Sequence, residues 1–150
     1  NSSRYLPFPV TQVQQAYLFG RRGYIELSQV SCFSYQEYDL PTYINIERLE
    51  QALNHLIQRH EALRILFISD TEQRILEKTP YYTIPIFDLP DGISVEEQLL
   101  KRRTQLSHQI RPANQWPLFD VQLTRFIDHD KHRLRIHIGF DLLIFCRLQW

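Results

Sequence analysis

The chain has 150 residues, 43% hydrophobic and 23% charged, enough for one globular domain that buries about two-thirds of its unfolded surface. Lys and Arg together number 17, as do Asp and Glu, so the sequence lacks the positive field that sequence-independent nucleic-acid binding needs. With this balance of charges we expect no nucleic-acid partner. No apolar run approaches ~18 residues, so we also expect no membrane span.

The start of the chain and its two cysteines are the features that bear on its cellular location. The chain begins at Asn1 without an initiator Met, so we expect it to be part of a larger protein. Its first residues have no signal-peptide pattern. In a chain without a secretory signal, two cysteines such as Cys32 and Cys146 are more often reduced than paired. We therefore predict a cytoplasmic location.

The first third of the chain predicts a helix, a strand and a second helix. The capping-box pattern of Thr11–Gln14 starts a helix over Thr11–Phe19, and Gly20 ends it. Residues 30–38 have strand composition. Apolar residues at helical spacing predict an amphipathic helix over Ile46–His60. The residues expected to share one face of the first helix are Val13, Ala16 and Tyr17.

The middle of the chain predicts short strands followed by a third helix. Arg64–Ser69 and Gln73–Lys78 have strand patterns on either side of a turn, and Tyr82–Phe87 is a further short strand weakened by a proline. A second capping box starts a helix over Val95–Ile110. We interpret its basic run, Lys101–Arg103, as a solvated face.

The clearest strand signal is a hairpin towards the end of the chain. Trp116–Ile127 and His132–Phe140 flank the turn Asp128–Lys131. Apolar and polar residues alternate over Arg133–Ile138, which is the period of a half-buried strand. We predict that all three helices pack on one side of the sheet containing this hairpin, in a layered α/β sandwich with a mixed sheet. The residues expected to face the core are Leu134, Ile136 and Ile138.

Two features are candidates for chemistry, and each has a structural alternative. Asp141 begins a wholly apolar turn after the last strand, where a carboxylate is costly unless it is paired, hydrogen-bonded or protonated. It is either an active-site group or the N-cap of a buried helix, and we weigh the two interpretations equally. Within Arg59–Arg64, an arginine either turns inward towards a buried carboxylate or belongs to a basic helix end, which the spacing favours.

Other ligand patterns are weak. His129 and His132 have the spacing of paired metal ligands, but no nearby Cys or second His pair completes a site, so we interpret them as surface residues. The chain has four glycines and neither a Gly-rich phosphate loop nor a Gly-x-Ser-x-Gly elbow. We therefore expect no metal and no nucleotide cofactor.

Taken together, these segments resemble the condensation superfamily of nonribosomal peptide synthetases, and within it the heterocyclization domains. Phe8–Arg21 is similar to that family's opening motif, FPLTxxQxAYxxGR, with Val10 for the usual Leu. Arg59–Phe67 is similar to the segment RHxxLRxxF, and Trp116–Phe119 to the segment WPLF. The residues that the resemblance marks in the first two segments are Gln14, Tyr17, Gly20, Arg21, Arg59 and Arg64.

The resemblance implies a catalytic role for Asp141. This residue falls where the heterocyclization motif DxxxxDxxS begins, whereas ordinary condensation domains carry HHxxxDG there. Cys146 stands where the second acid is expected, and Gln149 where the Ser is expected. In the superfamily that acid resembles a structural anchor for an arginine such as Arg64, and a buried arginine without its carboxylate is destabilising. Either the arginine points to solvent, or the motif is degenerate, or the last residues are not native family sequence.

The resemblance covers essentially the whole chain but only one lobe of the family fold. It implies that residues 1–150 form an N-terminal lobe with an α/β, chloramphenicol-acetyltransferase-like two-layer sandwich and a mixed sheet. In the family, a similar C-terminal lobe completes a tunnel between the two. That lobe is not in this sequence, so we expect the chain alone to be inactive.

The implied activity is heterocyclization, in which an amide forms between thioesters on upstream and downstream carrier proteins and then loses water to give a thiazoline or oxazoline. The resemblance implies no directly bound cofactor, because the substrates arrive on the phosphopantetheine arms of the carriers. Two alternatives stay open. The chain is a non-catalytic lobe that packs against partner domains, or it belongs to a condensation-type acyltransferase that forms only the amide.

Overall fold

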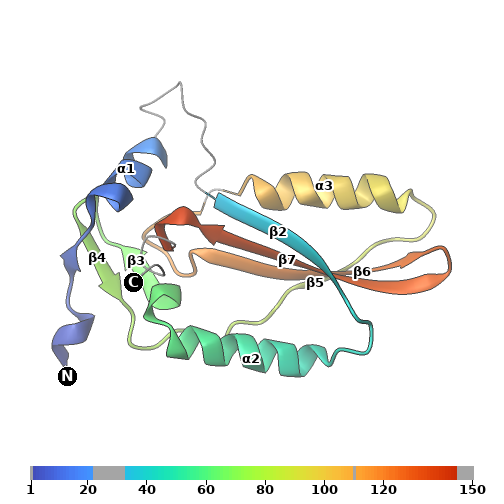
Figure 1. The fold of residues 1–150 in the computed structure, drawn as a ribbon, viewed down its shortest axis with the longest axis horizontal. Helices are drawn as coiled ribbons and strands as arrows, with labels where there is room; N and C mark the ends of the chain where they lie inside the picture. Colours follow the sequence, from blue (N-terminus) through green and yellow to red (C-terminus); the bar gives the residue numbers. More distant parts are fainter. Residues whose placement is uncertain (1, 22–32, 110, 145–150) are drawn as a thin grey trace.

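The computed structural model describes residues 2–21, 33–109 and 111–144 (Figure 1). Its helices are α1 (Gln12–Arg21), α2 (Ile46–Arg59) and α3 (Val95–Ser107), with 3₁₀ helices η1 (Ser2–Tyr5) and η2 (Glu61–Arg64). Its strands are β1 (Phe8–Pro9), β2 (Phe33–Leu40), β3 (Ile65–Phe67), β4 (Glu72–Ile75), β5 (Ile86–Asp88), β6 (Phe119–Asp128) and β7 (Lys131–Asp141).

The described strands form two sheets. The larger has the order β2-β7-β6-β5, and it is mixed because β5 runs parallel to β6 while the other pairs are antiparallel. The smaller has the order β1-β4-β3 and is antiparallel. The α/β class and the mixed sheet that the sequence predicted are confirmed.

The predicted hairpin is also confirmed. β6 and β7 pair from Phe119 and Phe140 down to Asp128 and Lys131, so two residues form the turn. These residues, His129 and Asp130, have φ angles of 49° and 62°, as a two-residue turn that follows the twist of the strands requires. At the other end of β7, Gly139 gives room for the ring of Phe33, because a Cβ there would lie 2.3 Å from that ring.

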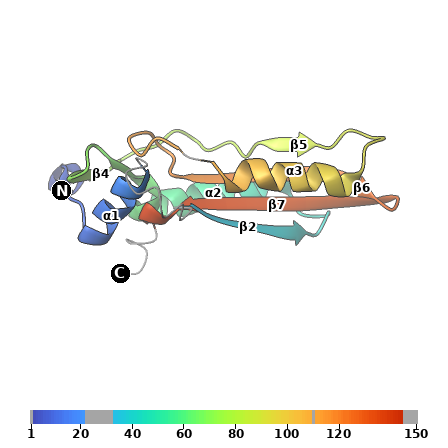
Figure 2. The same cartoon turned by 90° about the horizontal axis from the view of Figure 1, so that it is seen from above.

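The helices do not share one side of the sheet, so that prediction was wrong. α3 lies over one face of the larger sheet and α2 over the other, as the edge-on view of Figure 1 and the face-on view of Figure 2 agree. Alternation along β7 marks only its apolar face. The opposite face is covered as well, and Thr124 and His137 are buried there although both are polar.

The main core lies between α2 and the sheet. Ile57 packs there with Leu123, and Leu134 and Ile136 are buried in the same cluster. Ile138 is partly buried against it, so the predicted inward face of β7 is confirmed. At this core, the ring of Phe119, the first residue of β6, contacts the rings of Tyr82 and Trp116.

Some predicted boundaries and faces were wrong. α1 continues through Gly20 to Arg21, and its buried side chains are Gln14 and Leu18, whereas Val13 is 56% exposed. A polar side chain therefore occupies the inner face of this helix, which an apolar pattern does not predict.

Two further elements are shorter than predicted. α3 ends at Ser107, and β5 begins only at Ile86, after Pro85. Pro85 has no N–H to donate, but its carbonyl accepts a hydrogen bond from Leu123 N at 2.9 Å. The proline therefore lies at the entrance to the strand and still contributes to its pairing.

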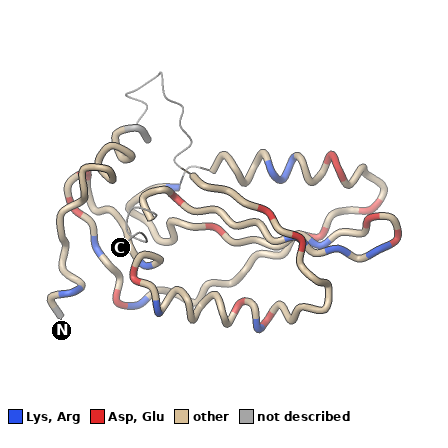
Figure 3. The backbone as a smooth tube through the Cα atoms, in the orientation of Figure 1, with Lys and Arg blue, Asp and Glu red and all other residues tan. Residues whose placement is uncertain are grey.

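Charges are interspersed along the described chain. Figure 3 shows lysine and arginine alternating with acidic residues over the helices and the hairpin. Within the described residues, no helix has the length and apolar character needed to cross a membrane. Those same residues contain no group of three or more His, Cys, Asp or Glu side chains that could hold a metal ion.

Candidate functional site

Asp141 ends β7 and is 3% exposed. Its main-chain N–H donates to Leu118 O at 2.9 Å, which ties it to the residue before β6. Its carboxylate oxygen Oδ1 accepts a hydrogen bond from Leu143 N at 3.0 Å, and residues 142–144 are helical. The side chain therefore caps the turn that follows the strand, as the N-cap interpretation, the second of the two open ones, predicts.

Gln14 of the opening motif reaches the same turn. Its side-chain Nε2 donates to Leu143 O at 3.5 Å and to Gln73 Oε1 at 3.2 Å. Gln73 Nε2 donates back to Gln14 Oε1 and to Pro9 O, both at 2.9 Å. The amide pair thus joins α1, β1 and β4 to the segment that Asp141 caps.

The other two motif segments contact each other, and one of them also contacts Asp141. The indole N–H of Trp116 donates to Leu63 O at 2.8 Å, which joins the two later motif segments. Leu118 belongs to the same motif segment as Trp116, and its carbonyl accepts the hydrogen bond from Asp141 N. Figure 1 shows α1, β3 and β4 gathered around the end of β7. Segments far apart in the sequence therefore assemble around Asp141.

Arg64 turns into the interior, but its partners are carbonyls. It is 6% exposed, and its guanidinium donates to Ile57 O at 3.0 Å and to Gln58 O at 3.3 Å, the last turn of α2. It also donates to the carbonyls of Leu76 and Glu77. Among the described residues, no carboxylate forms an ion pair with it. The arginine turns inward, so the solvent-pointing alternative was wrong, but the buried carboxylate that the inward interpretation expected is not found among these residues.

The remaining predicted residues have less defined roles. Arg59 is exposed at the end of α2. Tyr17 is partly buried against the core. Gly20 and Arg21 are the last residues of α1, and the side chain of Arg21 lies outside the described structure, as do the residues Cys146 and Gln149. Their predicted motif roles stay predictions.

A second polar cluster lies between α3 and the sheet, centred on His137, which is 1% exposed. Its Nδ1 lies 2.6 Å from the Tyr35 hydroxyl, and its Nε2 lies 2.7 Å from Thr124 Oγ1. Tyr35 donates its own proton to Glu37, and Thr124 accepts one from Arg102. Because the Tyr35 proton goes to Glu37, His137 donates from Nδ1 to Tyr35, and a neutral ring then accepts at Nε2 from the Thr124 hydroxyl.

The surroundings of His137 disfavour its charged form. Burial, with the positive charges of Arg102 and Arg135 added, lowers the pKa of His137 to about 4, against the attraction of Glu37. Burial acts to raise the pKa of Glu37, but hydrogen bonds from Arg103 and Tyr35 outweigh it and lower that pKa overall. The cluster is therefore built for a neutral imidazole beside an ionised carboxylate.

The basic run of α3 is only partly the solvated face that the sequence predicted. Lys101 is exposed, but Arg102 donates to Gln122 Oε1 at 3.1 Å and to Thr124 Oγ1 at 2.9 Å. Its guanidinium also lies 4.5 Å from the ring centre of Phe87. Arg102 therefore binds α3 to Gln122 and Thr124 of β6 and does not lie on a solvated face.

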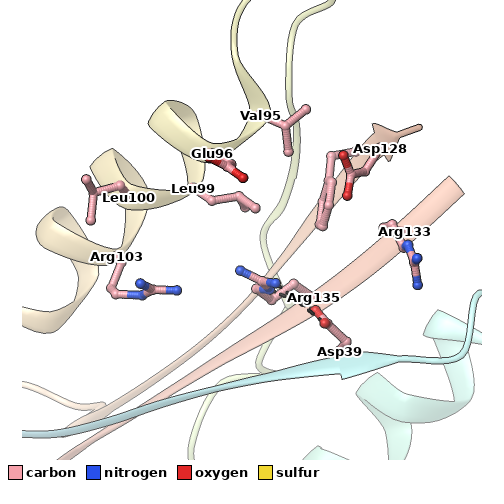
Figure 4. Close-up of a pocket in the computed structure, with 10 residues that line it drawn as sticks. Asp39, Val95, Glu96, Leu99, Leu100, Arg103, Asp128, Arg133 and Arg135 are labelled. Carbon is pink, nitrogen blue, oxygen red and sulfur yellow. Dashed lines mark hydrogen bonds and ion pairs between the residues drawn. The ribbon is translucent and has the colours of Figure 1, made fainter. Parts of the chain in front are cut away.

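A groove of about 420 Å³ lies between the N-terminal part of α3 and the end of the sheet that carries the β6–β7 turn (Figure 4). Arg103 projects into it from the helix, and Arg135 pairs with Asp39 at 2.8 Å across the sheet. Leu99 and Phe126 supply apolar surface. His129 and His132 are exposed at the hairpin nearby. The groove mixes both charges evenly, and it contains none of the predicted site residues.

Curated relatives have names from nonribosomal peptide synthesis. The chain is 31% identical over 144 residues to pyochelin synthetase PchF of Pseudomonas aeruginosa strain UCBPP-PA14, covering 95% of this chain and 8% of that protein. It is 31% identical over 138 residues to phenyloxazoline synthase MbtB of Mycobacterium sp. strain MCS, covering 91% of this chain and 11% of that protein. The chain thus spans about a tenth of the length of these relatives.

Solved structures of similar fold agree. The cyclization-docking bidomain of the nonribosomal peptide synthetase EpoB from Sorangium cellulosum aligns with a TM-score of 0.80 at 30% identity, covering 95% of this chain and 28% of that one. A variant of the starter condensation domain of rhizomide synthetase RzmA aligns with a TM-score of 0.74 at 21% identity, over 92% of this chain and 33% of that one, which supports the fold alone.

These likenesses confirm the chloramphenicol-acetyltransferase-like fold class that the sequence resemblance implied. The motif segments that suggested the resemblance are also the segments that meet around Asp141. Residues 8–138 match the condensation domain family, and the chain belongs to that family.

Proposed function

We propose that this chain forms the N-terminal lobe of a heterocyclization domain in a nonribosomal peptide synthetase. The observation that carries the proposal is the buried carboxylate of Asp141 at the end of β7, where ordinary condensation domains have the first histidine of HHxxxDG. The names of two similar proteins, a phenyloxazoline synthase and a cyclization-docking bidomain, support the same class of reaction.

In the proposed reaction, the amine of a Cys, Ser or Thr thioester on a downstream carrier protein attacks the acyl thioester on an upstream carrier. The amide bond forms as the upstream carrier's thiol leaves. The side-chain thiol or hydroxyl then adds to the amide carbonyl, and loss of one water gives a thiazoline or an oxazoline. Both substrates arrive on phosphopantetheine arms, so holding them together supplies much of the rate.

The proposal assigns residues 1–150 to one wall of a tunnel whose other wall is a second, similar lobe. Asp141 lies on the turn where β7 ends, with its carboxylate held by Leu143 N. We propose that the carboxylate acts on the ring-closing or dehydrating step, with the carriers and the second lobe as partners. A cytoplasmic location stays a prediction.

The test is a carrier-protein assay read by product mass, with the complete parent protein and preloaded carriers. The proposal expects a product lighter by one water than the linear amide. Accumulation of the linear amide alone would assign the chain to ordinary condensation. No product from either step would favour the second candidate below.

The second candidate is a non-catalytic lobe that packs against partner domains, and it is favoured by Cys146 at the position of the motif's second acid. The test compares the parent protein with its Cys146→Asp variant in the same assay. A ring product that appears only in the variant would show that the natural chain has lost the activity locally. Equal ring formation by both would show that the second acid is dispensable.

A further inference from the structure

We propose that Gln73 is a positioning residue for the reaction, acting on Asp141 through Gln14 and Leu143. This inference rests on the proposed function for its effect on activity, but its structural step is independent of it. Gln73 belongs to none of the motif segments described above. It lies on β4, alternates with exposed neighbours, and is 1% exposed, as is Gln14.

The amide pair has one orientation that satisfies all its groups. The Nε2 protons of Gln14 face Gln73 Oε1 and Leu143 O, and those of Gln73 face Gln14 Oε1 and Pro9 O. Gln14 Oε1 also accepts from Thr11 N at 2.9 Å. If the Gln14 amide flipped, its oxygen would face Leu143 O and its nitrogen would face Thr11 N. A flipped Gln14 would also turn its oxygen towards Gln73 Oε1 and its nitrogen towards Gln73 Nε2. Gln73, itself oriented by Pro9 O, therefore acts with Thr11 N to determine which end of Gln14 points at the turn.

Leu143 is held from two sides, and its side chain is fully buried. Its N–H donates to Asp141 Oδ1 at 3.0 Å, and its carbonyl accepts from Gln14 Nε2 at 3.5 Å, a long hydrogen bond. A shift of Leu143 at its carbonyl therefore also moves its N–H, which is a hydrogen-bond donor to the Asp141 carboxylate. Hydrogen bonds thus link Gln73 to Gln14, Gln14 to Leu143, and Leu143 to Asp141.

A packing role alone does not explain two buried amides. An apolar side chain at position 73 would fill space at no desolvation cost, whereas each amide must keep its hydrogen bonds to be tolerated. A fully satisfied polar network instead specifies one arrangement of the segments that it joins. Here the network joins β1, α1, β4 and the turn after β7. We infer that it thereby determines the position of Asp141, whose carboxylate is bonded to that turn.

The experiment uses the complete parent protein with Gln73→Leu, and Ile75→Val as a matched control from the same strand. Ile75 is also buried, and the Ile75→Val change removes one methyl group but no hydrogen-bonding atom. Two measurements are made on each protein: hydrogen exchange of the peptide that contains Leu143, and steady-state ring formation. Gln73→Asn, which keeps an amide but withdraws it by one methylene, replaces Gln73→Leu if that variant does not fold.

We expect the Leu143 peptide of the Gln73 variant to exchange at least fivefold faster, and kcat for ring formation to fall at least tenfold with KM for the carriers unchanged. The Ile75→Val protein should match the natural one in both. Exchange at the natural rate in the Gln73 variant overturns the inference, and so does an equal loss of kcat in both variants. If the natural protein forms no ring, the proposed function fails, and the exchange result alone still decides whether Gln73 positions the turn.

Discussion

At the scale of single residues, Arg64 is a buried positive charge that forms no ion pair with any carboxylate of the described residues. Its donors instead reach carbonyls in the last turn of α2 and after β4. The last carbonyls of a helix have no partner within the helix, and they lie at the negative end of its dipole. Arg64 therefore caps α2 from outside and joins it to the smaller sheet.

We predict that Arg64→Met lowers the free energy of unfolding by about 2–4 kcal/mol, because several buried carbonyls lose their donor at once. Arg59→Ala, which alters an exposed arginine five residues earlier, should change it by less than about 0.5 kcal/mol. Urea denaturation of the two variants beside the natural protein measures both. Similar losses for the two would mean that the carbonyl contacts of Arg64 do not stabilise the fold.

His137 makes stability depend on pH. Its folded-state pKa, about 4, lies below its ordinary value of 6.5, so the unfolded chain binds more protons between these values. The free energy of unfolding should therefore fall as the pH drops from 6.5 towards 4, by at most about 1.4 kcal/mol per pH unit from this group. Glu37, whose pKa is lowered, adds to the loss at lower pH still.

The check is the slope of stability against pH in His137→Gln, with His132→Gln at the exposed hairpin as control. The first variant should lose most of the slope between pH 4 and 6.5, whatever its absolute stability. The second should keep the natural slope. A His137→Gln protein that keeps the natural slope would show that the imidazole is not held neutral.

Sequence reasoning found some of these residues and missed others for identifiable reasons. Gln14 and Asp141 stood out because each occupies a position in a motif. Gln73 and His137 did not, because a polar residue in an alternating strand normally faces solvent, and each has a buried or half-buried hydrogen-bond partner in a distant segment, Gln14 and Tyr35 respectively. A buried hydrogen-bond partner more than fifty residues away leaves no local pattern.

At the scale of elements, α3 is fastened to the sheet by polar contacts as well as by its apolar residues. Arg102 lies between Leu99 and Leu106 on the inner face and bonds to Gln122 and Thr124 of β6. This explains why the basic run was assigned to solvent: a charged residue between two leucines breaks the apolar pattern. The long stem of an arginine nevertheless packs well against a sheet.

We predict that Arg102→Ala destabilises the fold by about 1–2 kcal/mol, since Thr124 and Gln122 lose a donor and Phe87 loses the guanidinium above its ring. Lys101→Ala, the neighbouring exposed residue on the same helix, should change stability by less than about 0.5 kcal/mol. Thermal unfolding of both variants provides the comparison. A larger effect at Lys101 would contradict the placement of α3.

Helix and strand identities followed well from the periods of the sequence, because α2 and the β6–β7 hairpin each have one strongly apolar face. The placement of helices on faces did not follow. A strand's pattern gives the face that is apolar, but not whether a helix also covers the polar face. Here the β5–α3–β6 connection places α3 over Thr124 and His137.

At the scale of the molecule, the proposed reaction needs two carrier-bound thioesters held together, and the proposal assigns to residues 1–150 one of the two walls that hold them. We therefore predict that a protein comprising residues 1–150 alone forms no ring product in the carrier-protein assay, while the complete parent protein does. Product mass, with and without the chain, is the readout. Ring formation by residues 1–150 alone would refute the two-lobe account.

The central claim is that the Asp141 carboxylate acts in chemistry and is more than a helix cap. The most direct measurement is the rate of ring formation by the complete protein carrying Asp141→Asn. Asparagine is also a strong N-cap, so Leu143 N keeps an acceptor and the melting temperature should stay close to that of the natural protein. We predict that ring formation nevertheless falls at least tenfold, because an amide can neither carry a charge nor exchange a proton as a carboxyl group does. Ring formation at the natural rate, with the fold intact, would contradict the account and leave Asp141 as a cap alone.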